Sequence, residues 1–452
     1  MNKPFDYRHA WQVNPQAKST DADKKAPFID NGTKRPDPKR YYDRDFMDQE
    51  WEKLWTKVWT IAGPVSDLPE AGDYFLYELG REQIIVVRGA DDVIRAFYNV
   101  CPHRGNRLVF EEFGSADNFT CAFHSWKFGL AGDNIAITDK ETFREEVLCH
   151  GTDLSGVRCE VACGLVFVSM DPDVMPLDEF LGPVKDMLDA YDIGKMHVVH
   201  HARNDWAANW KTGVDAFYEL YHLHAVHPET QGCMEDYYAQ YDTYPNGMSR
   251  MIVPFAVPSS RNDDRTQVDP GIQMMLGDAG IDPATFDGSG LEARAAIQKH
   301  KRASAAERGL DYDKFSDAQL TDSFPYGIFP NVQMGCHPEG VFLMRFLPHP
   351  TEPERFYYDT CTLYMPTKDD HGVPQWMGLP EGTDVSGDIR PDTIHVALGE
   401  KPNLGLVLDQ DSELLPHVQK GIRSQGFKGP LWGEQETRLR HFHTELDRYL
   451  EK

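Results

Sequence analysis

The chain has 452 residues, which is enough for two or three domains. Hydrophobic residues make up 40% and charged residues 26%, as in soluble globular proteins, and no apolar run is long enough to cross a membrane. The net charge of -26 is spread along the chain and argues against a nucleic-acid partner. The N-terminus lacks the apolar stretch of a secretory signal, so we expect a cytoplasmic, reducing location. There, grouped cysteines indicate metal or catalytic sites before disulfides.

Residues 1–62 are expected to form an arm and a helix that pack on a larger domain. The first 40 or so residues are polar and show no period, which indicates a loosely held segment. A helix is predicted next, because apolar residues then recur on one helical face. These residues are Met47, Trp51, Leu54, Trp55 and Val58, and the Ala-Gly-Pro at 62–64 is expected to end the helix.

Residues 63–175 are predicted to form a small all-β domain. Four runs rich in β-branched and aromatic residues, separated by turn signals, lie at 74–79, 83–88, 93–100 and 164–170. Residues 176–452 are predicted to form a larger mixed domain. It would contain a helix at 180–191, a strand at 197–201, and a helix that runs from Asn209 and stops at Pro228.

Further along, long strands of one sheet are predicted at 251–257, 341–349 and 355–366. The polar, Gly- and Asp-rich stretch 258–323 is interpreted as a surface lid. Near the C-terminus, an apolar helical face predicts a last helix; it carries Leu439, Phe442, Leu446 and Leu450.

Two of the eight cysteines are each followed closely by a histidine. Cys101 precedes His103, and Cys121 precedes His124. Zinc modules usually pair Cys with Cys and His with His, whereas each arm here is mixed. That order suits a cluster in which thiolates hold one iron and imidazoles hold the other, which is the ligation of a Rieske [2Fe–2S] centre.

The stretches CPHRGNRL and CAFHSWKF resemble the two ligand loops of the Rieske family, including Pro102, Arg104, Gly105 and Trp126. Ser125 departs from the family pattern, in which many members carry Gly. The resemblance implies a [2Fe–2S] cluster on Cys101, His103, Cys121 and His124. The remaining six cysteines are interpreted as small core or surface residues: Cys149, Cys159, Cys163, Cys233, Cys336 and Cys361.

A second candidate site lies in the segment DAFYELYHLHAVHP, which holds Asp215, Glu219, His222, His224 and His227. Two histidines and one distant carboxylate form the facial triad of non-haem Fe(II) oxygenases. His222 and His227 stand about 140° apart on an ideal helix, so they converge only if the helix unwinds before Pro228. His224 and His227 would converge on an unbroken helix, so geometry alone leaves both pairs open.

The segment NWK followed by Glu219-x2-His222-x4-His227-Pro228 resembles the catalytic-domain signature of Rieske non-haem iron aromatic ring-hydroxylating oxygenases, α subunit. The resemblance implies iron ligands His222 and His227 and a late carboxylate just inside a helix. In VLDQDSELL this carboxylate aligns best with Asp411, and Asp409 is the second choice.

Glu219 is expected to bridge the two metal sites rather than to ligate iron. It stands three residues before His222, so its carboxylate reaches the other ring N–H of that ligand. The resemblance adds a second partner, the Rieske ligand His124 of a neighbouring subunit. Asp215, one turn earlier, is the competing candidate for this bridge.

The implied fold is α+β, with a small all-β Rieske domain and a larger helix-grip-type catalytic domain built on a curved antiparallel sheet. The implied assembly is a head-to-tail homotrimer, or such a trimer with a small β subunit. The expected partners are an NAD(P)H-dependent reductase, with or without a ferredoxin, a small organic substrate and O2. Core packing is the favoured role for the candidate pocket residues Phe217, Met334 and Phe342.

The implied function is that of a terminal oxygenase that mono- or dihydroxylates an aromatic or related organic substrate. One alternative is a monooxygenase of quaternary amines, because carnitine-type members resemble this chain in having Glu at the position of Glu219. A pure electron-transfer Rieske protein is the other alternative, and the second His/carboxylate cluster counts against it.

Overall fold

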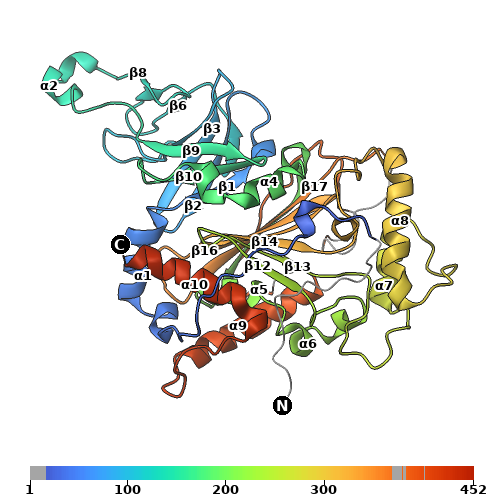
Figure 1. Ribbon diagram of the computed structural model, residues 1–452. Helices are drawn as coiled ribbons and strands as arrows, with labels where there is room; N and C mark the ends of the chain where they lie inside the picture. Colours follow the sequence, from blue (N-terminus) through green and yellow to red (C-terminus); the bar gives the residue numbers. More distant parts are fainter. Residues whose placement is uncertain (1–16, 369–378, 380–382, 402, 452) are drawn as a thin grey trace.

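The computed structural model describes residues 17–368, 379, 383–401 and 403–451. It folds into a smaller β-rich part and a larger part in which helices surround a second sheet (Figure 1). One hydrophobic cluster runs through both parts, from Phe75 and Tyr77 in the smaller to Val341 and Phe346 in the larger. Among the described helices, none combines the length and the apolar character needed to span a membrane.

The smaller part contains a seven-stranded antiparallel sheet with the order β1-β10-β9-β4-β3-β2-β5. All four strands predicted here are present. The Ala-Gly-Pro at 62–64 lies inside β1 rather than at a helix end, so that detail of the prediction is wrong. The strands are β1 (Thr60–Pro64), β2 (Asp73–Leu79), β3 (Glu82–Arg88), β4 (Ile94–Tyr98), β5 (Phe113–Ser115), β9 (Gly156–Ala162) and β10 (Leu165–Ser169).

A small three-stranded sheet lies at the far end of this part, beside the short helix α2 (Glu145–Leu148) (Figure 1). Its strands β6 and β7 flank the loop of Cys121 and His124. They are β6 (Phe119–Thr120), β7 (Lys127–Phe128) and β8 (Asn134–Ala136).

The predicted N-terminal helix is present as α1 (Arg44–Glu50), continued by a wider π-helical turn over Trp51–Trp55. Its apolar face is buried at Leu54 and Trp55, as predicted. The described part of the arm is not loosely held. Asp242 accepts hydrogen bonds from the backbone N–H of Ala26 at 2.9 Å and from the Lys25 ammonium at 2.8 Å. Asp242 is fully buried in the larger part, so these two hydrogen bonds fasten the arm to that part.

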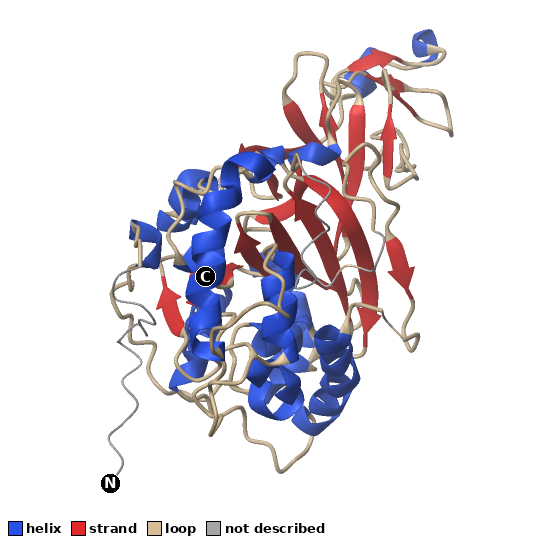
Figure 2. Cartoon of the chain, turned by 90° about the vertical axis from the view of Figure 1, so that its right-hand side faces the viewer, coloured by secondary structure: helices blue, strands red, loops and turns tan. Residues whose placement is uncertain are grey.

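The larger part is built on an eight-stranded sheet with the order β12-β13-β14-β15-β16-β17-β11-β18. Its neighbours are antiparallel except for the edge strand β18, which runs parallel to β11. Figure 2 shows the strands curving around helices packed against one face. The strands are β11 (His197–Trp206), β12 (Gln240–Thr243), β13 (Ser249–Ile252), β14 (Phe324–Ile328), β15 (Val332–His337), β16 (Gly340–Pro348), β17 (Phe356–Tyr364) and β18 (Ile394–Val396).

The helices of this part differ from the predictions in three places. The helix predicted at 180–191 is split into α3 (Leu177–Leu181) and α4 (Pro183–Asp189), because Gly182 adopts a left-handed φ of 51°. The stretch 258–323 contains α7 (Pro270–Asp278) and α8 (Gly290–Arg308), which have a hydrophobic cluster of their own. The third difference is at the candidate site, where the helix predicted to run to Pro228 is broken.

Helix α5 (Trp210–Phe217) lies unusually close to the sheet. A Cβ atom at Gly213 would stand 2.7 Å from the Phe356 ring and 2.8 Å from the Phe346 ring, so only glycine permits this approach. The helix is followed by the one-turn helix α6 (Leu223–Val226). Helices α9 (Leu406–Ile422) and α10 (Thr437–Leu450) come from the C-terminal region, and the predicted face of α10 is buried at Leu439, Phe442 and Leu446.

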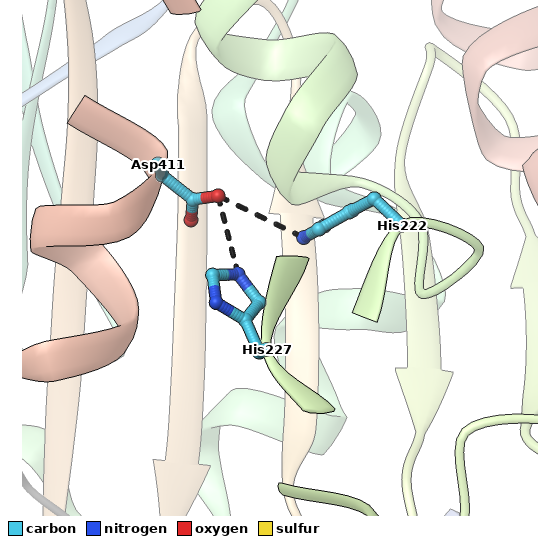
Figure 3. A group of neighbouring side chains, drawn as sticks. All are labelled: His222, His227 and Asp411. Atoms are coloured by element: carbon cyan, nitrogen blue, oxygen red, sulfur yellow. Dashed lines mark ion pairs between the residues drawn. The ribbon is translucent and has the colours of Figure 1, made fainter. Parts of the chain in front are cut away.

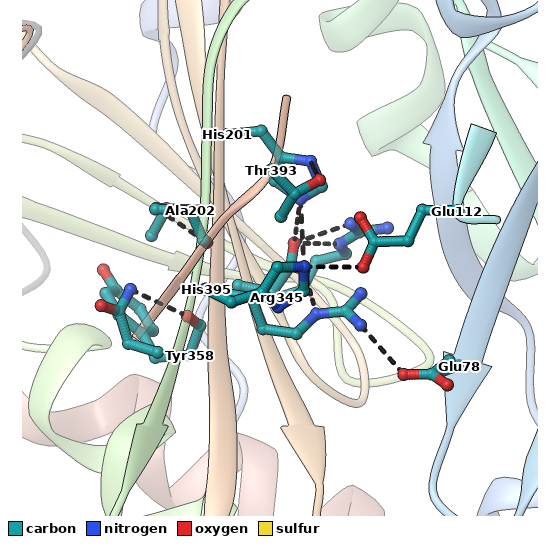
Figure 4. A network of polar contacts seen from close by, with 12 residues as sticks. Glu78, Glu112, His201, Ala202, Arg345, Tyr358, Thr393 and His395 are labelled. Carbon is teal, nitrogen blue, oxygen red and sulfur yellow. Dashed lines mark hydrogen bonds and ion pairs between the residues drawn. The ribbon is translucent and has the colours of Figure 1, made fainter. Parts of the chain in front are cut away.

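Buried charges join the two parts (Figure 4). Arg345 on β16 donates to Asp359 Oδ1 on β17 at 2.6 and 2.9 Å, and also to the carbonyl oxygens of Ile61 and Ala62 in β1. Arg203 on β11 connects the same Asp359, at 2.9 Å, with Glu78 of β2, at 3.1 Å. The network therefore ties the edge of the smaller sheet to the strands of the larger one.

Candidate metal centres

The first candidate centre lies on two loops that share one backbone design. In each loop the cysteine carbonyl accepts the N–H of the residue four positions later, at 2.9 Å: Gly105 in one loop and Ser125 in the other. Both residues have a left-handed backbone, with φ of 77° and 60°. Ser125 therefore adopts the conformation for which glycine is favoured, and the loop geometry is kept despite the substitution.

The four side chains converge at the tips of these loops. Cys101 and Cys121 are each 1% exposed, and the rings of His103 and His124 lie 4.5 Å apart at their centroids. The His103 ring stacks on Trp126 at 4.8 Å, which fixes its plane. The two loops thus place the two histidine rings beside each other and bring the two buried thiols into contact.

The donor set fits a [2Fe–2S] cluster. The Nδ1 atoms of both histidines are buried and have no hydrogen-bond partner within the described ranges. Buried polar atoms are rarely left unpaired, so two imidazole nitrogens in this state beside two thiols are suited to bind a metal. Burial opposes ionisation of Cys121, but the backbone N–H groups of Phe123 and His124, together with the side chains of Cys101 and Asn106, lower the pKa of the thiol.

The second candidate centre depends on the break between α5 and α6. The carboxylate of Glu219, which is 7% exposed, accepts the backbone N–H groups of Tyr221 and His222. These N–H groups would otherwise bond within a continuous helix, so the carboxylate stabilises a new helix start at α6. The helix is interrupted before Pro228, as predicted: α5 ends at Phe217, and α6 ends at Val226, so that His227 already has a non-helical backbone.

The break lets His222 and His227 face Asp411, which α9 supplies from the far end of the sequence (Figure 3). Asp411 Oδ1 lies 3.2 Å from His227 Nε2 and 3.9 Å from His222 Nε2. One ligand atom from each of the three residues lies within 4.8 Å of the others. His227 Nε2 is buried and makes no hydrogen bond to any described residue. Two imidazoles and one carboxylate in this arrangement fit an Fe(II) ion with open positions.

The residues that the sequence left as alternatives lie outside this group or have other partners. His224 is exposed on the outer side of α6 and does not belong to this group. Asp409 accepts the backbone N–H of Leu404 at 3.0 Å, a local bond at the start of α9. Asp215 accepts bonds from Tyr41 and His443, at 2.6 and 2.9 Å, and so already has two partners other than His222.

Each histidine of the group has an oxygen partner on its other ring nitrogen. His222 Nδ1 bonds Glu219 Oε1, and His227 Nδ1 bonds Gln410 Oε1 at 2.6 Å. Burial opposes protonation of His222, but the Glu219 carboxylate outweighs it and raises the pKa of the imidazole. Glu219 thus has the predicted contact to His222. Gln410 was not singled out from the sequence, where its only signal is its place beside Asp411.

Tyr358 of β17 lies close enough to Asp411 to be affected by its charge, and it packs on Phe217 at the end of α5. Phe217 stacks on Tyr358 at 5.3 Å, and the fully buried Tyr358 has its pKa raised well above the usual range by burial and then by the charge of Asp411. The three candidate pocket residues Phe217, Met334 and Phe342 all pack with the main hydrophobic cluster, in keeping with the core role favoured from the sequence.

Comparisons with known proteins agree with both halves of this description. The family described as ring hydroxylating alpha subunit (catalytic domain) matches residues 193–452, and the Rieske [2Fe-2S] domain matches residues 58–148. The first match covers more than half of the chain. The protein is therefore a member of the ring-hydroxylating α-subunit family, with a Rieske [2Fe–2S] domain followed by a catalytic domain that binds mononuclear iron.

The relatives include a monooxygenase subunit named for a quaternary amine and a dioxygenase subunit named for an aromatic compound. The carnitine monooxygenase oxygenase subunit of Escherichia coli (strain K12) is 34% identical over 202 residues, 42% of this chain and 52% of that protein. The biphenyl 2,3-dioxygenase subunit alpha of Rhodococcus jostii (strain RHA1) is 31% identical over 202 residues, 44% of each chain. The chain thus aligns with about half the length of these curated relatives.

Among solved structures, a quaternary ammonium Rieske monooxygenase in complex with an inhibitor superimposes with a TM-score of 0.66. It is 18% identical, and the superposition covers 92% of this chain and 95% of that one. This likeness confirms the predicted fold class: a Rieske domain joined to a catalytic domain with a curled antiparallel sheet.

Proposed function

We propose that the protein is the terminal oxygenase component of a Rieske oxygenase system, which hydroxylates an organic substrate with O2 and electrons from NAD(P)H. The observation that carries this proposal is the grouping of His222, His227 and Asp411 in a chain that also holds the four Cys/His donors. A pure electron-transfer protein would need only the second set, so the triad argues against that alternative.

In this proposal Cys101, His103, Cys121 and His124 hold the cluster, and His222, His227 and Asp411 hold the iron. When bound, the cluster supplies electrons one at a time and the iron supplies O2 activation. The domain boundaries stay as predicted: residues 1–62 for the arm and helix, 63–175 for the Rieske domain and 176–452 for the catalytic domain. The electrons would come from a separate reductase, with or without a ferredoxin, in a cytoplasmic trimer.

The surrounding residues orient the ligands and shield them from water. Glu219 holds the proton on His222 Nδ1, which leaves Nε2 of that ring directed toward Asp411. The rings of Tyr358 and Phe217 stack on each other in the main hydrophobic cluster, and Tyr358 is affected by the charge of Asp411. We expect this apolar packing to keep water away from the Asp411 side of the site.

The electron path is proposed to run between subunits of a trimer. Glu219 already contacts His222 within the chain, and its proposed second partner is His124 of a neighbouring copy. His103 and His124 support this path because they are partly exposed at the loop tips.

A quaternary amine is the second candidate substrate class beside an aromatic compound. Glu219 favours it, because the carnitine-type members resemble this chain at that position. The similarity to a carnitine monooxygenase oxygenase subunit agrees with this choice, although a biphenyl dioxygenase subunit is nearly as similar.

Two measurements test the proposal. The purified protein should contain about three irons and about two labile sulfides per chain, the sum of one [2Fe–2S] cluster and one mononuclear site. Stoichiometric zinc without sulfide would refute it. Oxygen uptake, with a generic reductase supplied, should then be measured over aromatic acids, steroids and quaternary amines. Uptake coupled to product from the amines alone would establish the second substrate class.

A further inference from the structure

Among the residues that the structure describes, Gln410 is the one that forms a hydrogen bond with the second ring nitrogen of His227, Nδ1. The imidazole of His227 is 0% exposed, so solvent cannot fix its orientation. Its Nδ1 lies 2.6 Å from Gln410 Oε1, and its Nε2 lies 3.2 Å from Asp411 Oδ1. The two ring nitrogens therefore face two consecutive residues of α9.

The partner of Nδ1 decides which nitrogen is able to bind a metal. A neutral imidazole carries one N–H and one lone pair. Because an amide oxygen only accepts, Nδ1 must carry the hydrogen, and the lone pair is then on Nε2. If the amide were reversed, its NH2 group would donate to Nδ1. The ring hydrogen would then lie on Nε2 and would point at the carboxylate and at the metal position. Metal ligation by Nε2 thus requires the oxygen of Gln410 at this place.

The two histidines of the triad differ in the charge of their partners. His222 faces the carboxylate of Glu219, whereas His227 faces a neutral amide. A carboxylate partner makes an imidazole a stronger electron donor, because it partly accepts the ring proton. A neutral amide fixes the tautomer without this effect, so the two nitrogen ligands of the proposed iron are unequal donors.

We propose that Gln410 is a positioning residue for the mononuclear iron, whose side-chain oxygen holds His227 in the Nδ1–H tautomer and whose neutral amide makes this ring the weaker donor. The proposal rests on the iron site described under the proposed function. It also explains the order of residues in α9, since one helical turn delivers both a carboxylate ligand and the group that orients the neighbouring histidine. The side chain acts through His227 and need not touch the substrate.

The test compares Gln410→Leu, Gln410→Glu and a matched control, Glu413→Gln. Glu413 is on the same helix with its side chain 71% exposed, so the control makes a Glu/Gln exchange away from the site. The readout is the transfer of ferrous iron from the anaerobic holoprotein to a chelator. The visible Rieske spectrum and the thermal unfolding midpoint of each variant report whether the fold is intact.

Gln410→Leu should weaken iron binding by ~10–100-fold, the usual effect of removing an outer partner of a ligand, while the Rieske spectrum stays unchanged. Gln410→Glu should restore binding to the wild-type level or tighter, because a carboxylate accepts the same hydrogen bond and increases donation by the ring. Glu413→Gln should match the wild type. This rescue separates a hydrogen-bond role from a merely space-filling one.

Binding by Gln410→Leu within about twofold of the wild type would overturn the proposal, as would a Gln410→Glu variant as weak as the leucine variant. These results leave the proposed function intact, provided that the wild-type protein binds the iron. A wild-type protein that takes up no mononuclear iron, although its Rieske cluster is complete, would instead refute the proposed function itself.

Discussion

Replacing Arg345 by methionine should lower the free energy of unfolding far more than removing an exposed arginine of the smaller part. Arg345 is 4% exposed and Asp359 is 0% exposed, so this is a buried ion pair with two hydrogen bonds. Breaking a buried pair by removing one partner costs about 3–5 kcal/mol, because the remaining charge stays desolvated. Asp359 keeps a bond to Arg203 at 2.9 Å, which places the expected loss near the lower end, about 3 kcal/mol.

The matched control is Arg81→Met. Arg81 also joins the smaller part to the N-terminal helix, through Asp48, but these side chains are 38% and 45% exposed. An exposed ion pair contributes about 0–1 kcal/mol, so this variant should unfold almost as the wild type does. Methionine is similar in length to the aliphatic part of arginine, so the packing along this part of the side chain is largely kept in both variants.

Urea unfolding measures both effects, followed by far-ultraviolet circular dichroism for the whole chain and by visible absorption for the Rieske cluster. In Arg345→Met we expect both signals to change at lower urea than in the wild type, since the arginine bonds carbonyl oxygens of β1 and a carboxylate of β17. Equal midpoints for the two variants would refute the reasoning, because burial would then make no difference to the strength of this junction.

Three further predictions concern the metal sites and the pH dependence of stability. His222→Ala should remove the mononuclear iron and leave the visible Rieske spectrum, whereas Cys101→Ser should bleach that spectrum. Iron analysis and visible spectroscopy measure both effects. Loss of the spectrum in His222→Ala would contradict the presence of two separate sites. Glu219→Gln should keep both metal sites filled but slow oxidation of the reduced Rieske cluster by at least about tenfold. Stopped-flow mixing with O2 and substrate measures this rate. A wild-type rate would point to Asp215 as the bridge. Burial, followed by the charges of Glu219 and Asp215, raises the pKa of Glu436 from 4.5 to about 7. The folded protein therefore binds more protons than the unfolded chain between these values, and wild-type stability should fall as the pH rises through that window. Glu436→Gln should reduce this pH-dependent loss of unfolding free energy by about 1–2 kcal/mol, a value lowered because the carboxyl is partly exposed. If the urea midpoints of the variant and the wild type showed the same pH profile, this role of Glu436 would be excluded.

Much of the candidate site could be predicted from the sequence because its signals are local. Each Rieske loop holds its Cys and His within four residues, and the loop closes through its own backbone bonds. The spacing of His222 and His227 is equally local. Runs of β-branched and aromatic residues bounded by turn signals similarly predicted four strands of the smaller sheet. The family and the fold class followed from these motifs and are confirmed by the comparisons.

Long-range contacts decided the rest. Helical spacing alone could not show that the chain breaks between α5 and α6, where Glu219 accepts two backbone N–H groups and His222 turns toward His227. The preference for Asp411 over Asp409 depends on which face of α9 meets the histidines, and that face is set by packing of residues some 180 positions apart in the sequence. The role of Gln410 and the buried Arg345 network depend on the same kind of contact. A sequence displays periodicity and short spacing, whereas the orientation of a side chain toward a distant partner exists only once the sheet and helices have packed.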